Sequence, residues 1–521
     1  MATTTINGTN GRLVTGANQY AFSNDGSANE TLNVTEDGFL ISTGTDAGAV
    51  RLGSNFGKWK VEISGTVLSQ QATGILLEQG GNTTAVFDFK EDASVSGVTG
   101  LDIRSDATLT NAGTISGSAY AITVSGAQVF SIKNSGTIVG DIREQAVIAE
   151  TKITNSGLID GAITLGDMNN TLIVAAKGRI TGNVNLAGGA DVLENAGEIG
   201  QISTGSGADK VTNSGSIASL NTSTGNDVVV NTGFIGSVDL GDGNDSYTGS
   251  GREDVVSDSN GGDTIKLGKG TDVYRATGAT LGLDDDDTIE AGGGGGDVYD
   301  SSAATNGVYV NLDSVSHTTA PFNAPASPFV SARTAIGVDV AGLDSKDEIR
   351  GFENVVGGSA ADVIYGNESA NELSGAGDGD FLFGFAGNDQ INGGSGNDWI
   401  NGGAGADRLF GGSGADSFQY LSVADSGAKD SKRDVIGDFE IGDVIDLSLI
   451  DADKKTPNDQ AFDFIGTNVN FTKVAGQLRS VWTADSQIVQ GDVNGDGKAD
   501  FAIQVYDPGH TITLSASDFV L

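Results

Sequence analysis

The sequence predicts an all-β protein in which most of the chain winds into parallel coils. Three observations support this fold class. Glycine occurs 80 times in 521 residues, whereas proline occurs 5 times and cysteine is absent. A nine-residue pattern repeats without a gap from Gly357, and aspartates upstream recur at twice that period. Short fixed periods are typical of solenoids, so we expect a right-handed parallel β-solenoid or β-roll followed by a β-rich C-terminal module.

The composition excludes several classes of partner. The formal net charge is -41 at pH 7. A chain this acidic repels nucleic acid and anionic lipid and attracts cations. No stretch approaches the ~18 apolar residues of a transmembrane helix, and the start, MATTTINGTNGRLVTG, lacks the basic and apolar regions of a Sec signal peptide. We therefore expect no nucleic-acid partner and no membrane insertion. If the protein is exported, we expect its export signal elsewhere in the chain.

The nine-residue units predict cation sites. They read GGSAADVIY, GNESANELS, GAGDGDFLF, GFAGNDQIN, GGSGNDWIN, GGAGADRLF and GGSGADSFQ. The apolar eighth residue would point inward, and the glycines permit turns with positive φ. Such turns direct backbone carbonyls and a sixth-position carboxylate to one point, and oxygen ligands suit Ca²⁺. A disordered glycine-rich linker, the alternative, does not explain one phase through seven units. The expected ligands are Asp362, Asp380, Asp389, Asp398, Asp407 and Asp416, with Gly375, Gly377, Gly393, Gly394, Gly396, Gly402, Gly403, Gly405, Gly411, Gly412 and Gly414 in the turns.

These units resemble the GGxGxDxUx repeat of RTX proteins. The resemblance implies a parallel β-roll that binds multiple Ca²⁺ ions between stacked turns. A second array of the same kind begins at Asp191 and continues at intervals of 18 and then nine residues. Its expected calcium ligands are Asp209, Asp227, Asp245, Asp254, Asp263 and Asp272.

An asparagine-glycine motif, N-[AST]-G-x-I, marks the other side of the upstream coils. Its asparagines are expected to stack as a structural ladder, as amides do in cross-β assemblies: Asn111, Asn134, Asn155, Asn195, Asn213 and Asn231. The pattern divides the chain into an irregular N-terminal β region and possible surface anchor (1–100), a solenoid without calcium turns (101–204), a first calcium roll (205–300), a connecting segment with a proline loop (301–356), a second roll (357–420) and a C-terminal cap (421–521).

The C-terminal region contains a further candidate calcium site. In DVNGDGKADF, the oxygen-bearing residues Asp492, Asn494, Asp496 and Asp500 have the spacing of the first nine positions of an EF-hand loop, with Gly497 for the turn. The glutamate of position twelve is missing. A polar hairpin turn is the alternative interpretation.

The chain from about Gly357 to its end resembles the C-terminal part of serralysin-type RTX proteins. The matching stretches are GGSGADSFQY, RDVIGDFEIGDVIDLS, GDVNGDGKADFAIQV and LSASDFVL. The resemblance implies an uncleaved C-terminal signal for a type I secretion apparatus. It also implies an extracellular or cell-surface location in a Gram-negative bacterium.

No catalytic motif accompanies these repeats. The two histidines, His317 and His510, do not form H-E-x-x-H, no G-x-S-x-G elbow is present, and there is no thiol. We expect a non-enzymatic, calcium-dependent structural protein of the cell surface, because the composition resembles that of S-layer proteins exported by type I systems. Expected partners are like chains and a surface polysaccharide or lipopolysaccharide. A calcium-dependent adhesin or biofilm-matrix protein is the alternative, and a secreted carbohydrate-active β-helix enzyme is the second.

Overall fold

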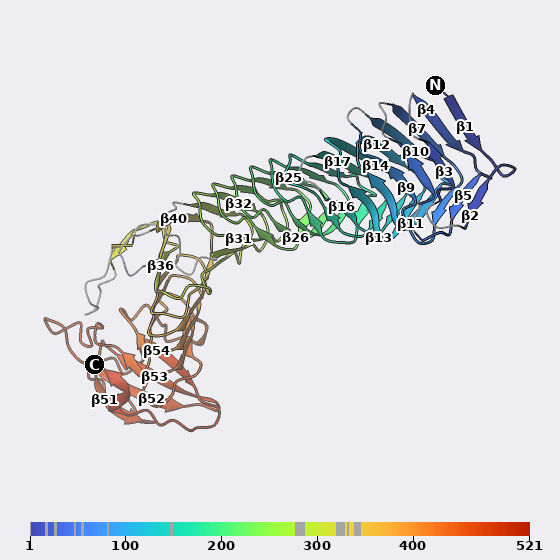
Figure 1. The fold of residues 1–521 in the computed structure, drawn as a ribbon. Coiled ribbons are helices and arrows are strands. Elements are labelled where there is room, and N and C mark those ends of the chain that lie inside the picture. Colours follow the sequence, from blue (N-terminus) through green and yellow to red (C-terminus); the bar gives the residue numbers. More distant parts are fainter. Residues whose placement is uncertain are drawn as a thin grey trace. The chain divides into compact units, whose positions relative to one another are not determined.

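The chain is almost entirely β-structure in its computed structural model (Figure 1). The structure describes residues 2–15, 19–24, 29–45, 48–53, 57–80, 83–145, 149–276, 287–318, 329–330, 333–337 and 345–521. Within these ranges there are strands and two 3₁₀ turns, η1 (Asp430–Lys432) and η2 (Ala516–Asp518). The chain divides into two compact units, Met1–Ser250 and Gly251–Leu521. Both consist of stacked parallel coils, which confirms the predicted fold class.

The first unit has three strand positions in each coil, and every coil pairs in parallel with the next. One position builds the first sheet: β1 (Ala2–Ile6), β4 (Glu30–Val34), β7 (Lys58–Ile63), β10 (Thr84–Phe89), β12 (Asp106–Asn111), β14 (Val129–Asn134), β17 (Glu150–Asn155), β20 (Thr171–Val174), β23 (Val192–Asn195), β25 (Lys210–Asn213), β27 (Val228–Asn231) and β30 (Ser246–Thr248).

The other two positions form adjoining rows, and four longer strands, β11, β13, β24 and β26, contribute to both. The first row contains β2 (Arg12–Val14), β5 (Phe39–Ser42), β8 (Thr66–Ser69), β11 (Ser94–Ile103), β13 (Thr114–Val124), β15 (Thr137–Val139), β18 (Leu158–Asp160), β21 (Arg179–Ile180), β24 (Glu198–Ser203), β26 (Ser216–Asn221) and β28 (Phe234–Ile235). The second row adds β3 (Phe22–Asn24), β6 (Val50–Leu52), β9 (Ile75–Leu77), β16 (Ile142–Glu144), β19 (Ile163–Thr164), β22 (Val184–Asn185) and β29 (Val238–Asp239).

The core of this unit is a set of continuous apolar columns. In the first sheet, Leu32 is in register with Val61, which is in register with Phe87, and all three are fully buried. The column continues through every coil to Tyr247. The coils expected in residues 1–100 share this core. Their coils differ in length, which hides the period, but their apolar positions are in register.

The first coil departs from this apolar pattern. Thr4 is in register with the buried Leu32, Arg12 with the buried Leu40, and Asn24 with the buried Leu52. Polar residues thus stand at three register positions of the first coil, among which Arg12 is exposed, while Ile6 and Phe22 keep the apolar pattern. Inward-pointing polar and charged groups protect exposed strand edges from pairing.

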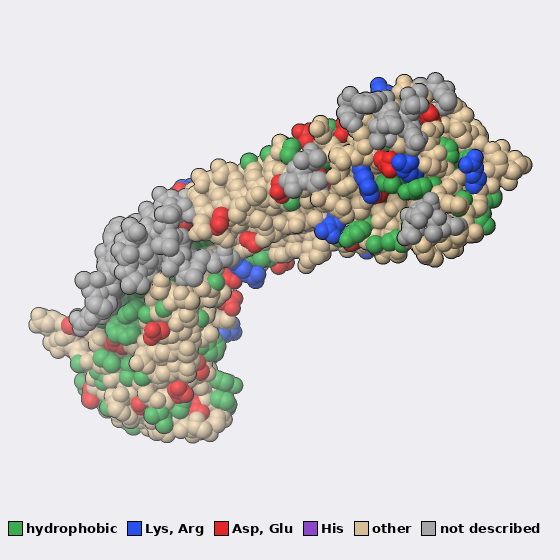
Figure 2. Space-filling view, viewed as in Figure 1, with side chains coloured by type: hydrophobic (Ala, Val, Ile, Leu, Met, Phe, Trp, Pro, Cys, Tyr) green, Lys and Arg blue, Asp and Glu red, His purple; other side chains and the backbone are tan. Residues whose placement is uncertain are grey.

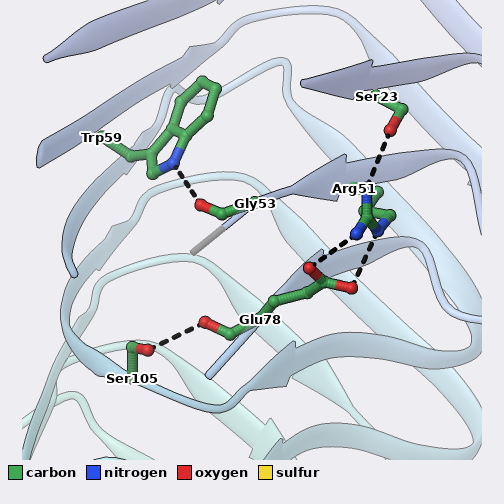
Figure 3. A network of polar contacts seen from close by, with 6 residues as sticks. All are labelled: Ser23, Arg51, Gly53, Trp59, Glu78 and Ser105. Carbon is green, nitrogen blue, oxygen red and sulfur yellow. Dashed lines mark hydrogen bonds and ion pairs between the residues drawn. The ribbon is translucent and has the colours of Figure 1, made fainter. Parts of the chain in front are cut away.

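Polar side chains link the first four coils across the second row (Figure 3). Arg51 donates two hydrogen bonds of 2.8 Å to the Glu78 carboxylate of the next coil and contacts Ser23 of the previous one. Ser105 donates to the Glu78 carbonyl at 2.8 Å. The Arg51–Glu78 pair is half-exposed, so we expect it to stabilise the fold by no more than about 1 kcal/mol. Figure 2 shows that basic side chains gather over these N-terminal coils.

Two asparagine ladders line the turns that follow the first sheet. Asn111 donates to Asn134, and Asn134 to Asn155, each at 2.8 Å. The register then reaches Val174, where the amide column is interrupted. A second ladder joins Asn195, Asn213 and Asn231 with bonds of the same length. All six predicted asparagines are buried and stacked, so the structural interpretation of this motif is confirmed.

The second unit has two strand positions in each of its regular coils. One sheet contains β32 (Thr264–Gly268), β34 (Thr288–Gly292), β36 (Val308–Asn311), β40 (Ser345–Arg350), β42 (Val363–Asn367), β44 (Phe381–Phe385), β46 (Trp399–Asn401), β48 (Ser417–Gln419), β50 (Val444–Asp446) and β55 (Phe519–Val520). The opposite sheet contains β31 (Val255–Asp258), β33 (Val273–Ala276), β35 (Val298–Asp300), β41 (Asn354–Val356), β43 (Glu372–Gly377), β45 (Gln390–Ser395), β47 (Arg408–Ser413), β49 (Asp434–Ile436) and β54 (Phe501–Tyr506).

Two antiparallel elements interrupt this regularity. In the connecting segment, β36 pairs with β39 (Thr334–Gly337), which pairs with β40, and β37 (His317–Thr318) pairs with β38 (Phe329–Val330). The predicted proline loop lies outside the described residues, since Pro321, Pro325 and Pro328 are not placed. Near the C-terminus, β51 (Asp463–Thr467) joins β52 (Gln477–Trp482) in parallel, and β52, β53 (Ser486–Asp492) and β54 form an antiparallel sheet.

Candidate calcium-binding turns

The sixth-position aspartates of the nonapeptide roll, residues 357–418, form a hydrogen-bonded ladder. The backbone N–H of Asp380 donates to Oδ1 of Asp398 one coil later at 2.8 Å, and Asp398 donates likewise to Asp416 at 2.9 Å. On the other side of the coil, Asn371 donates to Asp389, and Asp389 to Asp407, each at 2.8 Å. One carboxylate oxygen of each aspartate is thereby committed to the stack.

The second carboxylate oxygen has no such partner. Oδ2 of Asp380, Asp389, Asp398, Asp407 and Asp416 is buried and accepts no hydrogen bond within the described chain. A charged oxygen buried in this way is costly unless a cation or proton neutralises it. The donor set therefore fits a cation that prefers oxygen ligands, such as Ca²⁺.

The first position of each unit is glycine, and the absence of a side chain there leaves room for Oδ2 of the aspartate. A Cβ on Gly375 would lie 2.0 Å from Asp380 Oδ2, and one on Gly393 would lie 2.2 Å from Asp398 Oδ2. Gly402 and Gly411 face Asp407 and Asp416 in the same way. Any larger residue would displace the carboxylate.

The remaining predicted glycines lie in the turns themselves. Positive φ values occur at Gly394, Gly396, Gly403, Gly412 and Gly414, where side chains would be strained. Gly377 and Gly405 occupy equivalent turns, but their φ angles are outside the left-handed region. The part played by the glycine carbonyls as ligands stays a prediction.

Asp362 and Asn371, in the first two units, differ from the later aspartates. Asp362 Oδ2 accepts the Gly358 N–H at 2.7 Å, and Asn371 Oδ1 accepts the Asn367 N–H at 2.8 Å. Both oxygens are therefore satisfied by the protein. The cation sites that the geometry favours begin at Asp380.

Burial changes the acidity of these carboxyl groups. It raises the pKa of Asp380 to about 8 and that of Asp407 to about 7, with neighbouring carboxylates adding to the effect. For Asp389 and Asp398, burial raises the pKa to about 6. Without a cation these turns favour protons, so proton and cation compete for the same oxygens.

The upstream ladder, Asp191, Asp209, Asp227 and Asp245, has the same backbone connection. Each N–H donates to Oδ1 of the next aspartate at 2.7 Å. In the second unit, Asp254 donates to Asp272 at 2.8 Å and Asp263 to Asp287 at 2.7 Å. The predicted calcium ligands of this array thus all belong to such ladders, while their role as ligands stays a prediction: Asp209, Asp227, Asp245, Asp254, Asp263 and Asp272.

The turn preceding each upstream aspartate is built differently. Its first position, the equivalent of Gly375 in the roll, holds Leu186, Thr204, Thr222 or Leu240. All four side chains are buried. In Asp191, Asp209 and Asp227, as in the roll, Oδ2 is buried and accepts no hydrogen bond within the described chain. The upstream turns therefore share the aspartate ladder and its unbonded oxygen but not the glycine that faces it.

Five further aspartates belong to these ladders although the sequence analysis did not include them among the expected ligands. Asp272 donates to Asp297 at 2.8 Å, while Asp407 and Asp416 donate at 3.0 Å to Asp434 and Asp443. The sequence contains a pattern that could have identified them, because each aspartate is followed two positions later by an inward apolar residue, as in the repeats. These five aspartates are Asp191, Asp287, Asp297, Asp434 and Asp443.

The EF-hand-like segment forms the turn between β53 and β54. Asp492 accepts the N–H groups of Gly495 and Gly497 at 2.7 and 2.8 Å. Asp500 accepts the N–H of Val493 at 2.9 Å and the Asn494 side chain at 2.6 Å. Asp496 accepts the Lys498 N–H. The four predicted oxygens are brought into one turn, and these bonds are those of a stable hairpin, so the calcium role stays a prediction.

Comparison with known proteins identifies the repeats. Residues 350–382 and 383–418 match the family model of the RTX calcium-binding nonapeptide repeat (4 copies). The chain contains an RTX calcium-binding β-roll. The resemblance of the nonapeptide units to the RTX repeat is confirmed, and the roll binds multiple Ca²⁺ ions.

Solved structures with similarity to the chain include two subunits of an Azotobacter vinelandii mannuronan C5-epimerase. AlgE6R2 is 22% identical over 31% of this chain and 92% of its own, with a TM-score of 0.23. AlgE6R3 is 25% identical over 32% of this chain and 80% of its own, with a TM-score of 0.17. No curated protein matches the chain significantly. Among the described residues, no helix has the length and apolar character needed to cross a membrane.

Proposed function

We propose that the protein is an extracellular, non-enzymatic structural component of the bacterial cell surface, an S-layer or scaffold protein whose folding is completed by Ca²⁺. One observation carries the proposal: stacked coils with a continuous core account for most of both units. Most of the described chain therefore builds a repetitive body, as a surface scaffold requires. Self-association with like chains belongs to this proposal.

Electron microscopy of cells with and without the gene tests this function. We expect a periodic surface coat that disappears on deletion and returns when the protein and millimolar calcium are added back. An intact coat combined with lost attachment to surfaces would replace the scaffold with an adhesin. Calcium-dependent cleavage or epimerisation of a polysaccharide by purified protein would contradict the non-enzymatic assignment.

Export by a type I secretion apparatus forms part of the proposal. The C-terminal strand β55 pairs with β50, Phe519 packs against Phe464 with ring centroids 5.0 Å apart, and Leu514 is buried. Deletion of residues 514–521 therefore removes packing as well as any signal. Fusion of residues 462–521 to a passenger separates the two effects, and failure of that fusion to leave the cell would contradict the assignment.

A further inference from the structure

The outer face of the second row in the first unit carries a polar groove of about 410 Å³. It lies over β22, β24 and β26, and none of its lining side chains is charged. This is unusual in a chain whose net charge is -41. The lining residues are Asn183, Val184, Asn185, Gln201, Ile202, Ser203, Ser219 and Asn221.

The coil geometry arranges these side chains in two rows. Val184, Ile202 and Leu220 are in register and point inward, where they are buried. The residue on either side of each therefore points outward, because side chains alternate along a strand. Neighbouring coils are about 4.8 Å apart, so each row repeats at that interval along the solenoid. The first row contains Asn183, Gln201 and Ser219, and the second contains Asn185, Ser203 and Asn221.

The second row is held in place by the protein. Asn221 donates to Asp239 at 2.6 Å and accepts from the Ser223 hydroxyl at 2.5 Å. Asn185 accepts the Ala187 N–H at 2.8 Å. Side chains fixed in this way lose little conformational entropy when a ligand binds.

The first row is free to bind. Within the part of the chain that the structure describes, the side chains of Asn183, Gln201 and Ser219 make no hydrogen bond. Asn183 and Gln201 are exposed, and Ser219 is half-buried. Each amide offers two donors and one acceptor, and the hydroxyl offers both functions.

We infer that this groove binds an uncharged polysaccharide chain lying along the coils. Sugar hydroxyls both donate and accept, as amides and hydroxyls do, and the repeated rows present the same groups at successive coils. An anionic chain would find no cationic partner among the lining residues. The apolar lining side chains, Val184 and Ile202, are buried in the core, so they offer little surface to an anchor residue of a protein segment. The inference goes beyond the proposed scaffold function and does not depend on it.

Calorimetric titration of the full-length protein in millimolar calcium tests the inference, with cellohexaose and dextran as neutral probes and polygalacturonate as the anionic one. We expect saturable binding of a neutral probe. Gln201→Leu and Asn183→Leu, which keep the side-chain size but remove hydrogen bonding, should each weaken it by roughly tenfold. Ser219→Thr retains the hydroxyl and should preserve binding, whereas Ser219→Ala should weaken it.

Gln390→Leu is the matched control, because Gln390 is an exposed strand glutamine in the second unit, outside the groove. Its binding should equal that of the unmodified protein. Circular dichroism establishes that every variant is folded. The inference is overturned if no neutral probe binds at millimolar concentration, if only the anionic probe binds, or if Gln201→Leu binds as tightly as the unmodified protein.

Discussion

The nonapeptide roll and the upstream ladder use the same aspartate connection in different surroundings. In both, a backbone N–H donates to Oδ1 of the aspartate one coil later. In the roll, glycine faces the other oxygen, and calcium-type turns occur on both sides of the coil. In the upstream ladder, a buried Leu or Thr precedes the turn, and an asparagine ladder occupies the opposite side.

The comparison separates two roles that one sequence motif combines. The aspartate aligns successive coils wherever it occurs, since that requires only Oδ1. The glycine that faces Oδ2 in the roll is replaced by Leu or Thr in the upstream ladder, and we expect this difference to decide how well a cation fits beside Oδ2. The asparagine ladder aligns coils with neutral amides, so it needs no cation to neutralise it. We therefore expect dependence on calcium to increase from residues 101–180 through the upstream ladder to the roll.

Removal of calcium should have the largest effect. With chelator, the roll has buried carboxylates about 4.8 Å apart along the stack and no cation between them. We expect hydrogen exchange to show lost protection across residues 205–420, most completely in 357–420, while residues 101–180 remain protected. Uniform protection with and without chelator at low salt would remove the distinction between the two regions.

The calcium-free roll should depend on pH with a definite sign. The pKa of Asp380 is about 8 and that of Asp407 about 7 in the fold, whereas an unfolded aspartate titrates near 3.9. The folded state thus binds more protons between these values, and its stability decreases as pH rises. We expect thermal unfolding in chelator to occur at a higher temperature at pH 5.5 than at pH 8.5, and the opposite order would contradict these shifts.

Single substitutions compare the two ladders directly. Asp398→Asn keeps an oxygen for the Asp380 N–H but removes the charge. We expect it to raise the calcium midpoint for folding by roughly tenfold, the value of one charge-assisted contact. Asp227→Asn, its counterpart upstream, should change the midpoint less. Equal shifts would mean that the facing glycine is not what distinguishes the sites, and no shift for Asp398→Asn would mean that it is not a ligand.

The smallest effect is expected in the asparagine ladder. Asn134→Ala removes the acceptor of Asn111 and the donor to Asn155 inside the coil stack. Unsatisfied buried groups of this kind cost about 1–3 kcal/mol. Denaturant unfolding should show that loss equally at high and low calcium. A loss of unfolding free energy that depends on calcium would instead mean that the stability of this ladder is coupled to calcium binding in the roll.

Much of the roll could be predicted because its period is constant. Asp380 to Asp416 keep one phase, so aligning the repeats locates them in the coil. Asp434 and Asp443 stand one coil later across a step of 27 residues instead of 18, and the insertion hides them from a search by period. The register of the N-terminal coils is hidden for a similar reason: Leu32, Val61 and Phe87 share a column at unequal spacings. The groove could not be foreseen, because its residues are polar surface positions until the register brings them together.

The polar first coil has a consequence for templated growth. A parallel β-stack can in principle recruit further strands at an exposed end, as an amyloid fibril does. Here a newcomer with an apolar column would have to cover Thr4, Arg12 and Asn24 instead of leucines. Burying the Arg12 guanidinium without a counter-charge would oppose that step. We expect these three positions to disfavour end-to-end pairing at this coil, whereas Ile6 and Phe22 there keep the apolar pattern.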